Sequence, residues 1–373
     1  MLFLIITTIT KLRANLFCLD KYRESIVKHR KHFITAAVFF VIMLFTLSCS
    51  REGKVIYPSG PSDKQPTATG IYTNTPTHTR TITPTPSETP RFTKWKLENA
   101  DPGFPASSSG AAVVYDNKMW YIPLESNSGV WYSINGIDWV LATSSPSFNW
   151  IFDGELLLYN NEMWLIRSYN FGYPLEIWKS SNGVDWTMVT DDTGYPGRVY
   201  SCYEVYQDKI WAFSGYGSWG RQYNDVWNSY DWIIWNKTTL DGGLFFEQRA
   251  YADSFVMNGK LWIIGGIHYA KNLSDVCYTV DGYDWVMITD TLPFSGSTIK
   301  SVAVIDERIW CISPNADKSV WYSDNAVDWK AATKNAEFQE MTRGNIIYFN
   351  SKLWMIGGYE IGVGATSKVW SSE

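Results

Sequence analysis

The sequence predicts an all-β protein, a six-bladed β-propeller of four-stranded antiparallel blades over residues 91–373. Two series of tryptophans predict it. The first ends a short hairpin at Trp120, Trp164, Trp211, Trp262, Trp310 and Trp354, at intervals of 44, 47, 51, 48 and 44 residues. The second falls at Trp95, Trp139, Trp186, Trp235, Trp285 and Trp329, at intervals of 44, 47, 49, 50 and 44 residues. Periods of about 40–50 residues are those of propeller blades.

The position of Trp95 predicts how the ring closes. Residues 92–99 match the last strand of the repeat, whereas the sixth copy stops at Trp370-Ser-Ser-Glu373, before that strand. A chain that begins with the last strand of its own repeat can complete its C-terminal blade with its N-terminal strand. This closure covers an edge where the ring would otherwise fray.

Each repeat divides into four short strands. The first, such as residues 111–115, is apolar on both faces and suits the innermost position of a blade. A tight turn such as Asn258-Gly259 leads to the second strand, and the third carries Val-Trp-Tyr-Ser, as at residues 130–133. A second turn such as Asn135-Gly136 leads to the fourth. Asn-Gly pairs are strong hairpin signals, and the abundant Trp, Tyr, Val and Ile favour strands.

Residues 259–266 (Gly-Lys-Leu-Trp-Ile-Ile-Gly-Gly), followed by Ser274-Asp-Val and Asp281-Gly-Tyr-Asp-Trp285, resemble the kelch-like repeat of bacterial surface proteins in the galactose oxidase and kelch superfamily. The resemblance covers all six copies, although the Gly-Gly pair persists only at Gly265-Gly266 and Gly357-Gly358. It implies a propeller, and an interaction module as its function. The copper oxidases of this superfamily need two His and two Tyr, whereas the propeller contains only His268.

The first 90 residues differ in composition from the rest. Residues 1–33 are an N-terminal extension, which we interpret as an overlong reading of the gene, ending in a basic n-region. An apolar run at 34–47 leads to Cys49, so that residues 34–49 resemble a bacterial lipoprotein signal with Cys49 as the lipidated residue. Thr and Pro dominate residues 50–90, which predicts a disordered linker. We therefore expect an exported protein, lipid-anchored in the cell envelope, with plain secretion or a periplasmic address as the alternative.

The composition limits the classes of ligand, metal and cofactor that we expect. The formal net charge is −5 and the propeller has no basic stripe, so we expect no nucleic-acid partner. The propeller contains three cysteines at strand positions, Cys202, Cys277 and Cys311, which we interpret as buried small hydrophobic residues; a disulfide between two of them stays open. No cluster of His suits a catalytic zinc. We expect no metal, no cofactor and no catalytic residue, and a monomer that contacts a membrane through its anchor alone.

A sialidase-like glycosidase is the enzymatic alternative. The motif Ser-x-Asn-Gly-x-Asp-Trp is similar to the Asp-box of sialidases but one residue shorter. Loop arginines are available to bind a carboxylate, but no Arg-Ile-Pro signature precedes the first copy of the motif. Because Asp-boxes are turn structures, the motif argues for the fold more than for hydrolysis.

The long loops carry the predicted binding site. Loops between the second and third strands, and loops between blades, emerge on one face and are rich in aromatic residues and Arg, the types enriched at binding hot spots. Arg198 and Arg249 each lie thirteen residues before their hairpin Trp, so we expect both at the channel mouth. The candidate ligand-binding residues are Trp150, Tyr195, Arg198, Tyr216, Trp219, Arg221, Tyr223, Arg249, His268, Tyr269, Arg343 and Tyr359. We expect a non-catalytic binding module for a protein partner, with a glycan ligand as the alternative.

Overall fold

The computed structural model describes residues 91–373, except 125–128, 149–151, 169–171, 239–245, 295–301 and 314–317. The predictions for residues 1–90, including lipidation of Cys49, lie outside the described residues. So does the candidate site residue Trp150.

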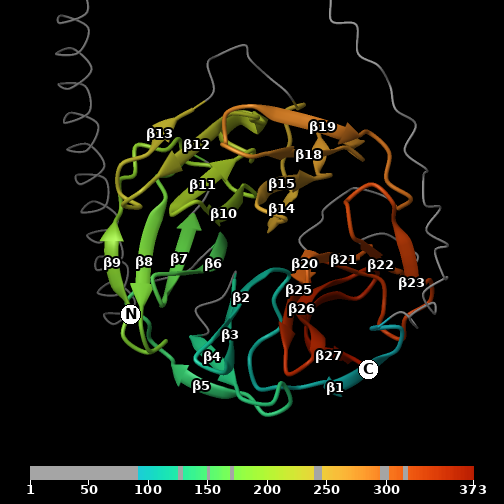
Figure 1. Cartoon of the computed structure of the whole chain (residues 1–373). Coiled ribbons are helices and arrows are strands. Elements are labelled where there is room, and N and C mark those ends of the chain that lie inside the picture. Colours follow the sequence, from blue (N-terminus) through green and yellow to red (C-terminus); the bar gives the residue numbers. More distant parts are fainter. Residues whose placement is uncertain are drawn as a thin grey trace, which may run out of the picture. The chain divides into compact units, whose positions relative to one another are not determined.

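Six antiparallel sheets stand around a central axis and form a six-bladed β-propeller, as predicted (Figure 1). The first blade contains β2 (Gly110–Tyr115), β3 (Lys118–Pro123), β4 (Val130–Ser133) and β5 (Val140–Thr143). The second contains β6 (Asp153–Tyr159), β7 (Glu162–Ser168), β8 (Glu176–Ser180) and β9 (Thr187–Thr190). The third contains β10 (Cys202–Tyr206), β11 (Lys209–Phe213), β12 (Val226–Ser229) and β13 (Asn236–Lys237).

The remaining blades follow the same order. The fourth contains β14 (Asp253–Met257), β15 (Lys260–Ile264), β18 (Val276–Thr279) and β19 (Trp285–Thr289), and the fifth contains β20 (Val302–Ile305), β21 (Arg308–Ile312), β22 (Val320–Ser323) and β23 (Lys330–Thr333). The sixth contains β25 (Asn345–Phe349), β26 (Lys352–Glu360), β27 (Gly364–Ser372) and β1 (Trp95–Asn99), with the short β24 (Met341–Thr342) beside β26. Two loop elements, the hairpin β16 (Ile267–His268)–β17 (Lys271–Asn272) and the 3-10 turn η1 (Ser218–Gly220), complete the described structure.

The N-terminal strand closes the ring in the predicted way. Strand β1 pairs antiparallel with β27, with Trp95 opposite Ser372 and Leu97 opposite Trp370. Beyond the ladder, the Glu373 N–H donates to the Lys94 carbonyl at 2.9 Å. The last blade is therefore built from both ends of the propeller, with β1 as its outermost strand.

The first strand of every blade lies innermost. Strands β2, β6, β10, β14, β20 and β25 contact one another in this order, and β25 contacts β2 again. The hydrophobic core lies between blades, in six clusters that contain the tryptophans of both series. All three propeller cysteines are buried and free, as the sequence predicts, which answers the open question of a disulfide between two of them.

The hairpin tryptophans have a local reason for their spacing. The two residues of each first turn have positive φ, as at Asp116 (49°) and Asn117 (54°), a conformation that Asn and Asp tolerate. The indole N–H of Trp120 then donates to the Tyr115 carbonyl five residues earlier, and Trp164, Trp211, Trp262 and Trp354 repeat this bond. In these five blades the first turn is therefore fastened by the Trp that follows it.

The second turn, present in the first five blades, differs from the predicted Asn-Gly hairpin. At Asn135-Gly136 only the glycine has positive φ (80°), whereas the Asn135 side chain accepts the N–H groups of Ile137 and Asp138 at 2.9 Å each. The hydroxyl of Ser133 accepts the Gly136 N–H. In the third blade Asp231 replaces Asn, accepting two N–H groups, and Trp232 takes the positive φ of 66°. The conserved element of this turn is a side-chain cap.

Candidate functional site

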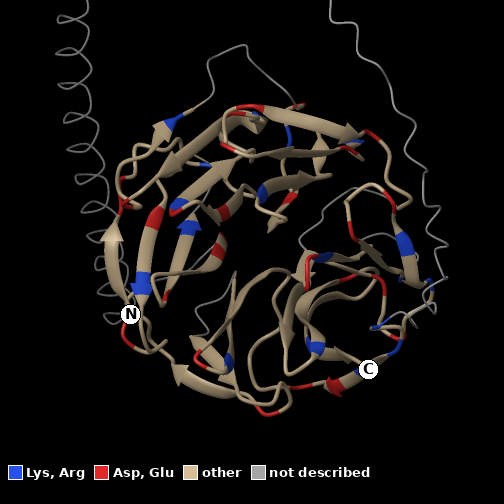
Figure 2. Ribbon diagram, viewed as in Figure 1, with Lys and Arg blue, Asp and Glu red and all other residues tan. Residues whose placement is uncertain are grey.

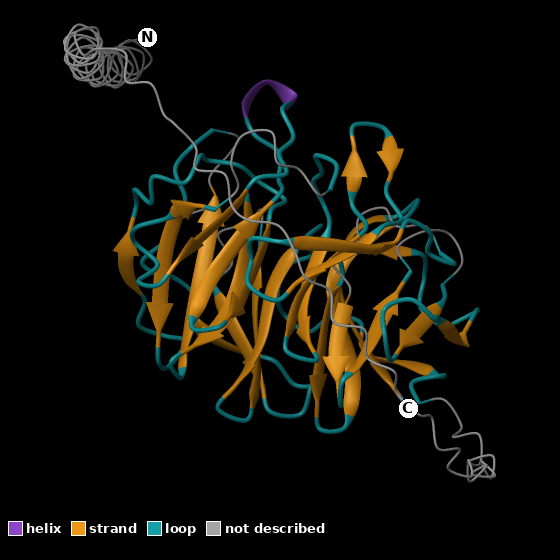
Figure 3. Ribbon diagram, turned by 45° about the horizontal axis from the view of Figure 1, so that its top comes forward, coloured by secondary structure: helices purple, strands orange, loops and turns teal. Residues whose placement is uncertain are grey.

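The loops divide the propeller into two faces. The long-loop face carries the loops between second and third strands and those between blades; the short-turn face carries the other turns. Figure 3 shows η1 and the hairpin β16–β17 projecting on the same side of the molecule. Backbone bridges join loops of the two kinds, Val199 with Tyr216 and Ala250 with Ile267. The long loops are thus fastened to one another as a continuous surface.

Exposed apolar side chains occur on both faces, and on the long-loop face they lie in the loops between the second and third strands. Trp219 is fully exposed, and its φ of 61° sets it at the tip of η1. The second-to-third-strand loops of the second, fourth and sixth blades also expose large apolar residues. We call these residues the apolar rim: Tyr173, Trp219, Tyr269, Tyr359, Ile361 and Val363. Three of the predicted site residues, Trp219, Tyr269 and Tyr359, belong to it.

Three other predicted site residues are buried, and this corrects the sequence-based expectation. Arg198 and Arg249 have no exposed surface, and Tyr195 has almost none. Arg249 makes a bidentate pair with Asp275, at 2.8 and 2.6 Å, and donates to the Gly265 carbonyl. Arg198 pairs in the same way with Asp225. The two arginines occupy equivalent positions in their repeats, as predicted, but their side chains are buried and fasten loops within a blade.

The remaining predicted residues lie in the loops at intermediate or full exposure. Tyr223 lies between two guanidinium groups, with Arg198 Cζ at 3.8 Å and Arg221 Cζ at 5.0 Å from its ring centre. Tyr216 bridges two loop segments through its backbone. His268 lies 3.3 Å from Glu247 Oε2 and beside the Tyr269 ring. These residues border the apolar rim.

Sequence reasoning missed two residues that organise this face. Gln222, which is buried, accepts the Tyr269 N–H at 2.7 Å and donates to the Ile267 carbonyl, so it joins the long loops of the third and fourth blades. Asn224 donates to the Phe246 carbonyl at 2.9 Å. Neither belongs to the repeated motif, so periodicity gave no signal for them.

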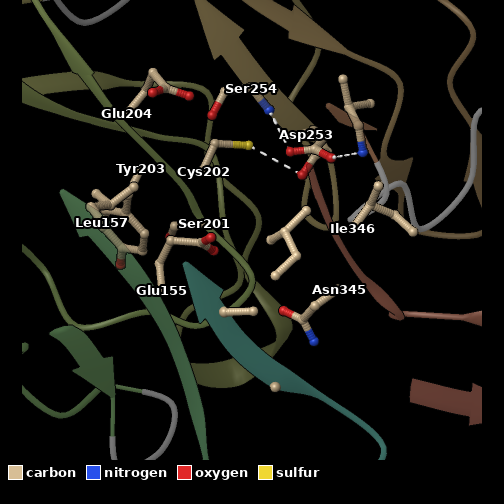
Figure 4. Close-up of a pocket in the computed structure, with 15 residues that line it drawn as sticks. Glu155, Leu157, Ser201, Cys202, Tyr203, Glu204, Asp253, Ser254, Asn345 and Ile346 are labelled. Carbon is tan, nitrogen blue, oxygen red and sulfur yellow. Dashed lines mark hydrogen bonds between the residues drawn. The ribbon is translucent and has the colours of Figure 1, made fainter. Parts of the chain in front are cut away.

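A cavity of about 190 Å³ occupies the central channel (Figure 4). Its lining comes from the inner strands, and three carboxylates from successive blades face it: Glu155 on β6, Glu204 on β10 and Asp253 on β14. The carboxylate of Asp253 accepts the N–H groups of Ser254 and Val302, at 2.9 and 3.0 Å, and so joins the fourth and fifth blades. Around the ring as a whole, acidic and basic residues are interspersed (Figure 2).

The carboxyl group of Glu204 has an altered acidity. Burial raises its pKa to about 8, and the negative charges of Asp253 and Glu155 contribute to the rise. Its hydrogen bond within the described residues comes from the adjacent Val205 N–H, at 3.2 Å from Oε1. At neutral pH the proton therefore stays largely on Glu204, and the channel carries less negative charge than its residues suggest.

Three residues at equivalent positions lie where the chain enters the channel from the long-loop face. Tyr200, Tyr251 and Arg343 each precede an inner strand, with φ of 56°, 59° and 58°. The two tyrosine rings stack with centres 4.0 Å apart. The Arg343 guanidinium lies 5.2 Å from one ring centre and 5.1 Å from the other, and donates to the Tyr251 hydroxyl at 3.4 Å. We call this group the channel cap; only Arg343 was predicted.

The described residues contain no group of three or more His, Cys, Asp or Glu arranged to hold a metal ion. Nor does this part of the chain include a helix of the length and apolarity needed to cross a bilayer.

Comparison with known proteins supports the fold. No family model matches the chain, and no curated protein matches it. Among solved structures, the propeller protein YjhT is similar, with a TM-score of 0.57 and 10% identity over 71% of this chain and 94% of that chain. At this identity the likeness concerns architecture alone: the chain is a β-propeller.

Proposed function

We propose that this protein is a non-catalytic binding module whose long-loop face docks a protein partner through the apolar rim. The observation that carries the proposal is the full exposure of Trp219, on a turn with positive φ, together with five further exposed apolar residues on the same face. Exposed apolar clusters of this kind mark interaction sites, and Trp and Tyr dominate binding hot spots. Backbone strain held at a loop tip is also typical of functional positions.

We propose in addition that the propeller is of the kelch type and that the protein is located in the cell envelope. The Gly-Lys-Leu-Trp motif at residues 259–262, with related sequences in the other five copies, supports a kelch-type propeller, and the segment ending at Cys49 supports export with lipid anchoring. A protein held at the cell envelope by a long linker is suited to capturing a partner, because the linker lets the propeller search the space around its anchor.

A glycan is the second candidate ligand, and Trp219 favours it too. An exposed indole offers a flat apolar surface on which the face of a sugar ring can stack, and the neighbouring Tyr216 and Arg221 supply polar groups. The two candidates differ in how many rim residues they need. A sugar needs one or two aromatic rings, whereas a protein partner needs the rim across several blades.

The test compares capture of envelope proteins and glycans by the full chain, its Trp219→Ala and Tyr269→Ala variants, and Tyr230→Ala as a matched control. Tyr230 is about as exposed as Tyr269 but lies on a turn of the short-turn face. We expect a specific protein partner that is lost with either rim variant and kept by the control. Glycan binding lost only with Trp219→Ala would favour the second candidate, and equal capture by all four proteins would refute both.

A further inference from the structure

The channel cap lies directly over the central cavity. Tyr200 and Tyr251 are followed at once by the cavity-lining residues Ser201 and Ala252, and Arg343 precedes the lining residue Asn345 by two positions. Inner strands run from the long-loop face toward the short-turn face, so the cap stands at the long-loop end of the channel. Arg343 reaches from the sixth blade to Tyr251 on the fourth and so crosses the mouth.

The cap holds a cation against two aromatic rings. Three buried arginines on this face each have a carboxylate partner: Arg167 pairs with Glu176 at 2.7 Å, Arg198 with Asp225 and Arg249 with Asp275. Arg343 is half-buried, makes no ion pair with the described residues, and interacts with the Tyr200 and Tyr251 rings and the Tyr251 hydroxyl. Cation–π contacts are individually weak, and the 3.4 Å hydrogen bond from Arg343 to the Tyr251 hydroxyl is long, so the Arg343 side chain is weakly held.

The cavity beneath the cap suits a positive charge. Glu204 faces it with one oxygen that accepts no hydrogen bond among the described residues, and Glu155 and Asp253 lie on the strands to either side. Hydroxyls of Ser201 and Ser254 and the amide of Asn345 line the same space. A buried carboxylate is stabilised by a nearby cation, which removes the cost of its desolvation.

We propose that the central channel binds an organic cation, an ammonium or guanidinium group on an aliphatic stem, and that Arg343 occupies its mouth until this ligand displaces it. The stem would lie against the stacked Tyr200 and Tyr251 rings, where the Arg343 guanidinium now lies, and the charged group would lie beside Glu204. The same chemistry is carried by a free amine and by a Lys or Arg side chain of a bound protein. This site is separate from the apolar rim and does not depend on it.

Binding should release a proton from the channel. The groups that face Glu204 are Glu155 from β6 and Asp253 from β14, while the lining residues of β2, β20 and β25 are not titratable. Because burial beside these two carboxylates raises the pKa of Glu204 to about 8, the group is largely protonated at pH 7. A bound cation favours the charged form, so affinity should rise as the pH rises toward 9.

Isothermal titration of the full chain in mild detergent tests the proposal with agmatine as the free cation, a capped Gly-Arg-Gly peptide as the side-chain form, and butylurea as a neutral analogue. We expect saturable binding of at least one cation, about tenfold tighter at pH 9 than at pH 7, and no binding of butylurea. Tighter binding of agmatine identifies a free amine as the ligand, and tighter binding of the peptide identifies a protein side chain.

Variants locate the binding to the channel. Arg343→Ala should tighten cation binding about tenfold because it removes the competing guanidinium, and Tyr251→Phe, which keeps the ring, should tighten it less. Glu204→Gln should weaken binding and abolish its pH dependence, while Tyr230→Ala on the other face should leave it unchanged. Absence of cation binding in the wild type and both cap variants, or weaker binding in Arg343→Ala with an unchanged melting temperature, would overturn the proposal. Neither result bears on the apolar rim.

Discussion

Gly136 of the first blade lies against Trp354 of the sixth, so closely that a methyl group on the glycine would come 2.3 Å from two ring atoms of the indole. The same contact joins Gly183 to Trp120 and Gly282 to Trp211, each pair on adjacent blades. In the third blade Trp232 takes the position of the glycine and its ring lies 4.5 Å from that of Trp164. The two halves of the repeated sequence therefore meet across the boundary between blades.

This contact predicts that Gly183→Ala is strongly destabilising. The new methyl group would come 2.0 Å from the Trp120 ring, and the φ of 74° strains any residue with a Cβ. Overpacking costs about 1–3 kcal/mol and the strained backbone about 1 kcal/mol more, so the free energy of unfolding should fall by about 2–4 kcal/mol in urea titration. Gly259→Ala is the control, because Gly259 has a similar φ of 66° but no atom within 4 Å of the added methyl. Equal losses in the two variants would contradict the blade-to-blade explanation.

The buried pair of Arg249 and Asp275 should be far more sensitive to mutation than an exposed ion pair. Asp275→Asn leaves a guanidinium with no exposed surface and no carboxylate partner, which costs about 3–5 kcal/mol of unfolding free energy. The exposed pair of Arg308 and Asp324 provides the comparison, since Asp324→Asn should change stability by less than about 1 kcal/mol. Thermal unfolding monitored by Trp fluorescence measures both, and a small effect at Asp275 would show that this ion pair does not hold the loops.

Ring closure makes the N-terminal strand an essential part of the C-terminal blade. Trp95 is buried against Phe338, with ring centres 5.2 Å apart, so Trp95→Ala should lower the unfolding free energy by about 3–5 kcal/mol. Leu97 on the same strand is partly exposed, and Leu97→Ala should cost much less. Hydrogen exchange would locate the effect: we expect β27 to lose protection in the Trp95 variant, and unchanged exchange in β27 would argue against closure by this strand.

The raised pKa of Glu204 predicts a pH-dependent stability. Because its pKa rises from an ordinary value of 4.5 to about 8 in the folded protein, folding is favoured by the protonated form. This contribution is complete below pH 4.5 and is lost as the pH rises through 8, with a slope of at most about 1.4 kcal/mol per pH unit. Denaturant titrations of the wild type and Glu204→Gln between pH 5 and 9 should therefore diverge with rising pH, the wild type becoming the less stable. A constant difference would mean that Glu204 does not titrate in this range.

The architecture could be predicted from the sequence because the residues that pack between neighbouring blades recur in every repeat. The Trp spacing and the early copy of the last strand at Trp95 together predict both the number of blades and the β1–β27 pairing. The second turn was predicted only in part, since the hydrogen bonds of Asn135 that replace a positive φ at this residue depend on side-chain geometry.

The candidate site was less predictable because loop partners are far apart in sequence. Arg249 has its carboxylate partner 26 residues away, and a signal was available: an acidic residue precedes the Val or Ile of the third strand at Glu176, Asp225 and Asp275. Tyr200 and Tyr251 occupy the same position in successive repeats, which also marked them as a pair. Their stacking over the channel depends on positive φ values, which cannot be predicted from a tyrosine in the sequence.

The chain enters the propeller on the side opposite the long loops. Arg91 lies 3.4 Å from Asp306, at a first turn of the fifth blade, and donates to the Tyr348 hydroxyl. If the protein is anchored through its N-terminal segment while a partner pulls on the long-loop face, tension would run along β1 from its Trp95 end. The ladder between β1 and β27 would then be loaded in shear, with its hydrogen bonds sharing the force, and the strand that closes the ring would also act as its mechanical clamp.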